Sequence, residues 1–158
     1  RPPRSTLDRS SAASDVYKRQ FEDVELGDDI GPITRTVESD QVLEFVSLRE
    51  PDPKPSRFTS EAAAKEEGLP NAIVPGAMNI ALMSQILTDW SPTVCLKKID
   101  VVFRGMVPHE KPLTFSGIVT DKDDSGNSTD LECDIVMENQ EGVRLVIGHA
   151  EFALPSKP

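Results

Sequence analysis

Hydrophobic and polar residues alternate in four stretches of the C-terminal half of the chain, at 97–104, 112–121, 130–138 and 143–153. Alternation with a period of two predicts strands that bury one face. The segments between these stretches carry turn-forming residues, in the runs GMVPHEKP, DKDDSGNS and ENQEG. We therefore expect four consecutive strands that form an antiparallel meander.

Residues 76–90, GAMNIALMSQILTDW, are apolar almost all round the helix that their spacing predicts. Pro75 stands at a suitable position for the first turn of this helix. A helix with so little polar surface is buried, so we expect the sheet to wrap around it. The stretch is too short to span a bilayer, which needs about 20 apolar residues. A single α+β domain results, with no internal repeat and no βαβ alternation.

The N-terminal part of this domain is expected to be shorter and less regular. A turn at Gly31-Pro32 precedes a strand at 33–37. Ser39 or Asp40 is expected to cap a helix at 41–48. Three prolines between positions 51 and 55 predict a rigid non-helical connection, followed by a short helix at 61–67 capped by Thr59 or Ser60.

Residues 1–20 differ from the rest of the chain because they are basic, rich in serine and without an apolar run. Such a segment has nothing to bury in a core and lacks the apolar region of a signal peptide. Its run SSAASDVYKRQ resembles translated sequencing-adaptor read-through, and a genuine disordered arm is the alternative. We place 1–20 outside the domain and 21–158 within it.

The chain of 158 residues has a net charge of −10, which argues against binding to nucleic acid or to an anionic membrane through a basic surface. Two cysteines, Cys95 and Cys133, make neither a disulfide framework nor a four-ligand zinc site, and we expect two buried thiols in a reducing compartment. No metal-ligand cluster or phosphate-binding glycine loop is present in the sequence, so we expect no metal and no cofactor.

Residues 52–78 resemble the motifs of the MaoC-like hydratase/dehydratase family. The family motif D-x-N-P-[IL]-H corresponds to 52–57, DPKPSR, and is followed by the turn Gly68-Leu69-Pro70 and by the helix opening Ile73-Val74-Pro75-Gly76-Ala77-Met78. The run 101–105 followed by 112–117 is similar to the family's long strand pair. The resemblance covers about 21–154 and implies the hotdog fold, an antiparallel sheet wrapped around one long central apolar helix. Within the family, Thr88-Asp89-Trp90 is most similar to single-hotdog subunits of steroid-side-chain hydratases.

The resemblance implies reversible addition of water to the C2=C3 bond of an enoyl thioester, with the motif His as general base and the motif Asp orienting the water. Carried over by position, the catalytic candidates are Asp52 and Arg57. The substrate-binding candidates lie at the helix opening, where a backbone N–H would polarise the thioester carbonyl: Pro75, Gly76, Ala77 and Asn79. The alternative to a catalytic role is that Asp52 and Arg57 form a structural salt bridge.

Three positions depart from the family pattern. Arg57 stands at the position of the catalytic His, Lys54 at that of the motif Asn, and Pro75 at that of the His in the helix opening. Arginine cannot act as a base near neutral pH. The two histidines of the chain do not align with the family base, since we expect His109 in a solvated turn and His149 on a face of the last strand.

Three functions remain open at this point. The chain is an active hydratase/dehydratase that uses Asp52, a degenerate subunit that pairs with a complete hotdog subunit, or a homodimer that binds acyl-CoA without catalysis. The partners expected are an acyl-CoA or other acyl thioester and a second hotdog chain, identical or different. We expect a cytoplasmic location and no partner among nucleic acids or membranes.

Overall fold

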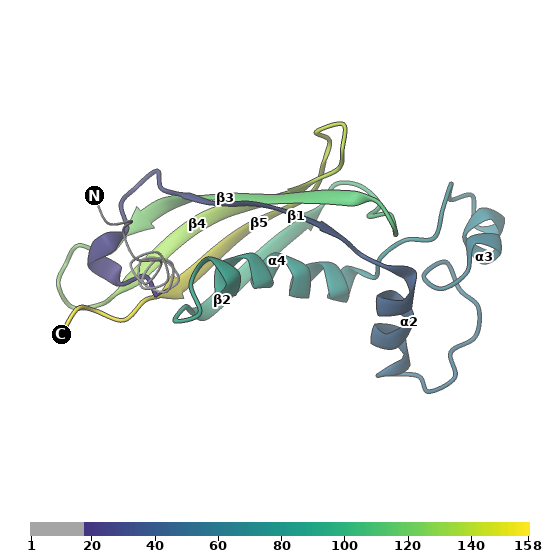
Figure 1. Ribbon diagram of the computed structural model, residues 1–158, viewed down its shortest axis with the longest axis horizontal. Helices are drawn as coiled ribbons and strands as arrows, with labels where there is room; N and C mark the ends of the chain where they lie inside the picture. The colour runs from purple at the N-terminus through teal and green to yellow at the C-terminus, as the bar shows by residue number, and fades with distance from the viewer. Residues whose placement is uncertain (1–17) are drawn as a thin grey trace, which may run out of the picture.

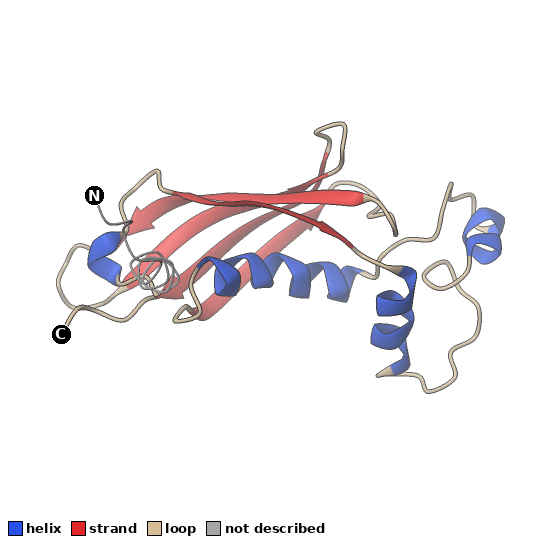
Figure 2. Ribbon diagram, viewed as in Figure 1, coloured by secondary structure: helices blue, strands red, loops and turns tan. Residues whose placement is uncertain are grey.

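The computed structural model describes residues 18–158, in which one long helix lies along one face of a five-stranded antiparallel sheet (Figure 1). Most of the segment placed outside the domain therefore falls outside the described residues. The elements in chain order are η1 (Phe21–Asp23), β1 (Asp29–Thr36), α2 (Ser39–Ser47), α3 (Glu61–Glu66), α4 (Gly76–Trp90), β2 (Cys95–Phe103), β3 (Pro112–Lys122), β4 (Asp130–Glu138) and β5 (Arg144–Ala153). The expected α+β class is confirmed (Figure 2).

The order of the strands in the sheet corrects the expected four-stranded meander. The observed order is β1-β3-β4-β5-β2, so only β3, β4 and β5 follow one another as neighbours. β2 pairs with β5 at one edge and β1 pairs with β3 at the other. The segment 104–111 is therefore a crossover from one edge of the sheet toward the other and not a tight turn. Periodicity predicts strands but contains no information on which strand pairs with which.

The first strand begins earlier than expected, at Asp29, and contains Gly31-Pro32 within it. The register of β1 with β3 shifts between Ile30 and Ile33. Gly31 and Pro32 therefore form an irregularity within the strand and not a turn before it. Gly31 has a φ of +83°, and a Cβ there would lie 2.9 Å from the carbonyl oxygen of Phe115. Glycine is required at this position for both reasons.

The hydrophobic core lies between α4 and the inner face of the sheet. Met83, Ile86, Leu87 and Trp90 of α4 are buried there. They meet the alternating inward residues of the strands, which include Leu131, Cys133, Ile135 and Met137 of β4 as well as Phe152 of β5. The Trp90 and Phe152 rings meet edge to face with centroids 6.0 Å apart. The predicted burial of one strand face is thus confirmed for β3, β4 and β5, whereas edge strand β2 has no buried residue.

The sheet does not wrap α4 completely, which corrects the expected burial of the helix on all sides. Ala77, Ile80 and Ala81 are exposed on the side of α4 away from the sheet. A five-stranded sheet covers one side of a helix, so the apolar residues on the opposite side remain open in a single chain. We find no helix in the described part of the chain that is long and apolar enough to cross a membrane.

The two short helices lie beyond the N-terminal end of α4 (Figure 1). α2 begins after Glu38, whose side chain forms a reciprocal capping box with Gln41, so the cap is one residue earlier than expected. Ser60 caps α3 as predicted, because its Oγ accepts from the N–H of Ala63. Each helix buries one residue, Val42 in α2 and Ala64 in α3.

The two cysteines differ in their surroundings. Cys133 is buried in β4, and burial raises the pKa of its thiol to about 12. Cys95, the first residue of edge strand β2, is exposed, which corrects the prediction that both thiols are buried. Among residues 18–158, no group of three or more His, Cys, Asp and Glu side chains is placed to hold a metal ion.

Candidate active site

The N-terminus of α4 presents backbone N–H groups at the surface of the molecule. Pro75 is the N-cap residue and offers no capping side chain, and Gly76 and Ala77 are exposed. The first N–H groups of an α-helix have no partner within the helix and carry partial positive charge. The Phe103 ring at the end of β2 lies against Gly76, 3.4 Å from the position of a Cβ. The arrangement can bind the carbonyl oxygen of a ligand.

Asn79 is the buried polar residue in the first turns of α4, with 3% of its surface exposed. Its Nδ2 donates to the carbonyl of Val74 at 3.4 Å, while its buried Oδ1 has no hydrogen-bond partner among the described residues. An unpaired buried amide oxygen is costly, so such an atom indicates a missing donor. Asn79 borders a cavity of about 200 Å³, which we call the small cavity, together with Arg57, Gly76 and Phe103.

A larger hollow of about 570 Å³, which we call the α2 cleft, also adjoins this helix end. It is lined by Phe45, Val46 and Arg49 of the α2 segment and by Pro75 and Ala77. Phe58 borders both hollows, so the two spaces are neighbours at the start of α4. The four substrate-binding candidates are thus brought together at these spaces, Pro75 and Ala77 in the α2 cleft, Gly76 and Asn79 in the small cavity.

Sequence reasoning did not single out the aromatic residues Phe58 and Phe103. Phe58 was detectable in principle, because it directly follows Arg57 in the motif. Phe103 comes from a strand remote in sequence, and no local signal indicates that it lies against Gly76.

The two catalytic candidates, Asp52 and Arg57, form no ion pair or hydrogen bond with one another among the described residues. Arg57 forms an ion pair with Glu67 at 3.4 Å and lies over the Phe58 ring, 5.1 Å from its centroid. No ion pair joins it to Asp52 among the described residues, so the expected salt bridge is not formed. Asp52 is exposed, with a φ of +60° that aspartate adopts more readily than most residues. Its neighbours Pro53 and Lys54 line the α2 cleft.

His109 is buried and not in a solvated turn as expected. Its exposed fraction is 7%, and both ring nitrogens are hydrogen-bonded. Nδ1 lies 3.1 Å from Oγ of Ser39, and Nε2 lies 2.9 Å from the carbonyl oxygen of Ile73. The turn-forming residues around His109 predicted exposure, but contacts from residues 70 and 36 positions away enclose the ring.

His149 lies on the outer face of β5, as expected. Asp134 and Glu132 on the neighbouring strand β4 contact its ring at 2.9 and 3.2 Å. The hydrogen bond that Asp134 accepts from the ring raises the pKa of His149 above its ordinary value, opposed by partial desolvation and helped by the charge of Glu132. The sheet separates this ring from α4, so His149 is not part of the candidate site.

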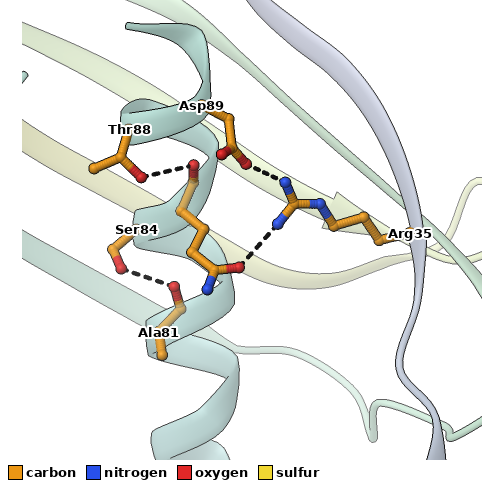
Figure 3. A network of polar contacts seen from close by, with 6 residues as sticks. Arg35, Ala81, Ser84, Thr88 and Asp89 are labelled. Atoms are coloured by element: carbon orange, nitrogen blue, oxygen red, sulfur yellow. Dashed lines mark hydrogen bonds and ion pairs between the residues drawn. The ribbon is translucent and has the colours of Figure 1, made fainter. Parts of the chain in front are cut away.

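The remaining polar residues of α4 serve the helix and its neighbour β1 (Figure 3). Ser84 and Thr88 donate to the backbone carbonyls of Ala81 and Gln85. The guanidinium of Arg35 in β1 donates to Gln85 at 2.8 Å and forms an ion pair with Asp89. These contacts hold edge strand β1 against the C-terminal half of α4 and leave Asn79 as the polar residue of α4 that borders the small cavity.

Comparison with solved structures finds the same architecture in several proteins. The chain is similar to R-hydratase PhaJ1 from Pseudomonas aeruginosa, with a TM-score of 0.75 and 19% identity over 87% of this chain and 86% of that one. It is similar to a MaoC-like dehydratase from Rhodospirillum rubrum, with a TM-score of 0.72 and 18% identity over 89% and 99% of the two chains. A chain of the ChsH1-ChsH2 complex from Mycobacterium tuberculosis gives a TM-score of 0.70 and 19% identity over 83% and 98%.

These likenesses establish the fold. The chain has the hotdog fold of (R)-hydratases and MaoC-like dehydratases, as the resemblance at 52–78 predicted. No family model matches the sequence, and no curated protein matches it.

Proposed function

We propose that this chain binds acyl thioesters at the N-terminus of α4 and acts in the hydration or dehydration of enoyl thioesters as one subunit of a hotdog pair. The observation that carries the proposal is the helix end itself. Free N–H groups at Gly76 and Ala77 and the unpaired Oδ1 of Asn79 adjoin two hollows. The thioester carbonyl accepts from the helix N–H groups, and a water or hydroxyl donates to Asn79.

The reaction adds a hydroxyl to C3 and a proton to C2 of the enoyl thioester, and therefore needs a base for the attacking water. The chain does not supply a free histidine for this step. His109 has both ring nitrogens bonded inside the protein, and His149 lies on the far face of the sheet. Arginine at position 57 supplies positive charge and cannot act as the base. A second identical chain would bring the same two histidines, so we infer a different hotdog subunit that carries its own Asp and His.

Edge strand β2 offers the surface for such a partner. Val102 and Phe103, which point to opposite faces of this edge strand, are exposed to 53% and 49%, and Phe103 lies against the start of α4 at Gly76. A free strand edge with exposed apolar residues is a surface that a second sheet can extend. The ChsH1-ChsH2 structure, whose chain this one resembles in fold, is a complex of two named components. The cytoplasmic location remains part of the proposal.

The second candidate is a hydratase that works alone through Asp52. It is favoured by the place of Asp52 in the loop whose next residues, Pro53 and Lys54, line the α2 cleft. In this case Asp52 orients the water, and Arg57 contacts an anionic group of the ligand.

One set of assays separates these functions. The full chain is purified, its oligomeric state is recorded, and the loss of the enoyl-thioester absorbance is followed with crotonyl-CoA and a longer enoyl-CoA. The expected result is binding without turnover, with turnover appearing on addition of a hotdog subunit that carries the complete D-x-N-P-x-H motif. Turnover by the chain alone that disappears in Asp52→Asn would establish the second candidate. A homodimer that binds CoA esters and never gains activity would indicate the non-catalytic role.

Binding itself is tested at Asn79. We expect Asn79→Leu to weaken crotonyl-CoA binding about tenfold or more, because a hydrogen bond worth roughly 1–2 kcal/mol is lost. Ser84→Ala is the matched control on the same helix, since the Ser84 hydroxyl bonds only the backbone of its own helix. Equal affinity of the wild type and Asn79→Leu by calorimetry would show that the ligand does not use Asn79.

A further inference from the structure

The α2 cleft is lined by Phe45, Val46 and Arg49 of the α2 segment, by residues of the loop 50–58, and by Pro75 and Ala77 at the start of α4. The first and the last of these groups are distant in sequence. The width of the cleft therefore depends on how α2 is held relative to the chain that enters α4. Neither α2 nor this entering chain belongs to the sheet, so strand pairing does not fix their separation.

His109 connects these two segments. Its Nδ1 lies 3.1 Å from Oγ of Ser39, the first residue of α2. Its Nε2 lies 2.9 Å from the carbonyl oxygen of Ile73, two residues before Pro75. A single buried ring thus bonds the first residue of α2 and the chain that leads to the cleft at Pro75, and it reaches both from a third segment, the crossover between β2 and β3.

The partners of the ring determine the role of Nε2. A carbonyl oxygen only accepts, so the Nε2–H group donates to the carbonyl of Ile73. Nδ1 forms its hydrogen bond with the hydroxyl of Ser39, which can either donate or accept. The ring therefore donates toward α4 and bonds a hydroxyl toward α2, which no single aliphatic side chain can replace.

Neighbouring backbone contacts complete the connection. The N–H of Ser39 donates to the carboxylate of Glu110 at 2.7 Å, and the N–H of Glu110 donates to the carbonyl of Val37 at 2.8 Å. The N–H of Val74 donates to the carbonyl of Val107 at 2.8 Å. The backbone therefore holds each side of the cleft to the crossover separately, while the ring of His109 bonds to both.

We propose that His109 is a positioning residue, which sets the distance between α2 and the start of α4 and thereby the affinity of the site for an acyl thioester. The inference rests on the function proposed above. It concerns a residue outside the motif at 52–57, and it assigns His109 no contact with the substrate.

The experiment measures crotonyl-CoA affinity of the full chain and four variants by calorimetry, well below their unfolding temperatures. His109→Leu removes both ring hydrogen bonds and Ser39→Ala removes one. His109→Gln keeps an N–H donor for the carbonyl of Ile73, and His149→Gln is the matched control for loss of a histidine elsewhere. We expect binding to weaken about tenfold in His109→Leu and about threefold in Ser39→Ala, since lost hydrogen bonds cost roughly 0.5–1.5 kcal/mol each.

His109→Gln is expected to restore most of the affinity, and His149→Gln to bind like the wild type. Wild-type affinity in His109→Leu, or equal losses in the Leu and Gln variants, would overturn the inference. If His109→Leu does not fold, the comparison of Ser39→Ala with the wild type decides it, and unchanged binding there counts against it.

A second readout keeps this inference separate from the proposed function. If the wild type binds no crotonyl-CoA, the proposed function fails, and amide hydrogen exchange then tests His109. We expect His109→Leu to speed exchange in α2 and at Val74 about tenfold, without change in β4 and β5, because local opening follows the lost contacts. Exchange that is unchanged in α2 and at Val74, or raised equally throughout the sheet, would overturn the role of His109.

Discussion

Two regions of the molecule are stabilised by different interactions. One region is the sheet together with α4, and the other is the segment 39–74. In the sheet, inward residues of every strand meet α4, and side chains such as Leu87, Ile135 and Phe152 are fully or almost fully buried. In segment 39–74, α2 and α3 bury one residue each, Leu48 is 79% exposed, and the other buried residues are Ala72, Ile73 and Val74 close to α4. The first region is determined by packing, and the second by caps, prolines and a few polar bonds.

This difference explains how the site can depart from the family motif while the fold is retained. Lys54 and Arg57 stand at positions where the motif has Asn and His, and both are exposed. Exposed substitutions change stability little, so the chemistry of this loop can change without loss of the fold. Buried substitutions in α4 and the sheet are different, because a change in side-chain volume there disturbs the packing of many neighbours and lowers stability.

The same substitution in the two regions gives the largest expected contrast. Leu87→Ala, at a position with no exposed surface, is expected to lower the free energy of unfolding by about 2–5 kcal/mol, because it leaves a cavity in the core. Leu48→Ala, at the end of α2, is expected to change it by less than about 0.5 kcal/mol. Urea denaturation measures both, and similar losses for the two would remove the distinction between the regions.

Caps are expected to matter more than packing within segment 39–74. Ser60→Ala removes the side chain that accepts from the N–H of Ala63 and should cost about 1 kcal/mol, seen as faster amide exchange in α3. Ser47→Ala is the control, since the Ser47 hydroxyl bonds the carbonyl of Leu43 within α2, an interaction that contributes little. If both variants exchange alike in their helices, capping is not what holds this segment.

The ion pair of Arg35 with Asp89 tests whether polar contacts stabilise the region determined by packing. Both side chains are partly exposed, at 34% and 42%, so we expect a coupling energy of only about 0.2–1 kcal/mol. A double-mutant cycle with Arg35→Met and Asp89→Asn, followed by denaturation in low and high salt, measures it. A larger coupling that resists salt would show that β1 depends on this pair and not on the core.

The smallest effect concerns His149 on the outer face of the sheet. Because Asp134 raises its pKa in the folded state, protonated His149 stabilises the fold fully below its ordinary pKa of 6.5. This stabilisation is lost as the pH rises through the higher pKa of the folded state. We therefore expect His149→Gln to be less stable than the wild type at pH 5.5 and equal to it at high pH. Unfolding curves across this range check the difference, and a gap that widens with pH contradicts it.

Most of the fold could be predicted because its elements leave local signals. The alternation in β3, β4 and β5, the apolar length of α4 and the Ser60 cap all follow from neighbours in sequence. The pairing of β2 with β5 could not be predicted, because it depends on the path of the crossover at 104–111. The open side of α4 was missed for a related reason, since burial depends on how far the sheet reaches around the helix.

Sequence reasoning named candidate site residues but not their contacts, and the roles of these residues stay a prediction. The motif at 52–57 and the helix opening at 75–79 were found from the sequence, and the hollows beside α4 adjoin both. The partner of Arg57 proved to be Glu67, although Asp52 is closer along the chain. His109 was misjudged because turn-forming neighbours predict exposure, whereas Ser39 and Ile73 enclose it from elsewhere in the fold.

The contrast between the two cysteines makes the wild-type chain suitable for site-specific labelling. Cys133 stays protonated and enclosed, so a maleimide or a spin label should react with Cys95 and spare Cys133. Cys95 begins β2, the exposed edge of the sheet. A fluorophore attached there would report the arrival of a second subunit at this edge without any engineered substitution.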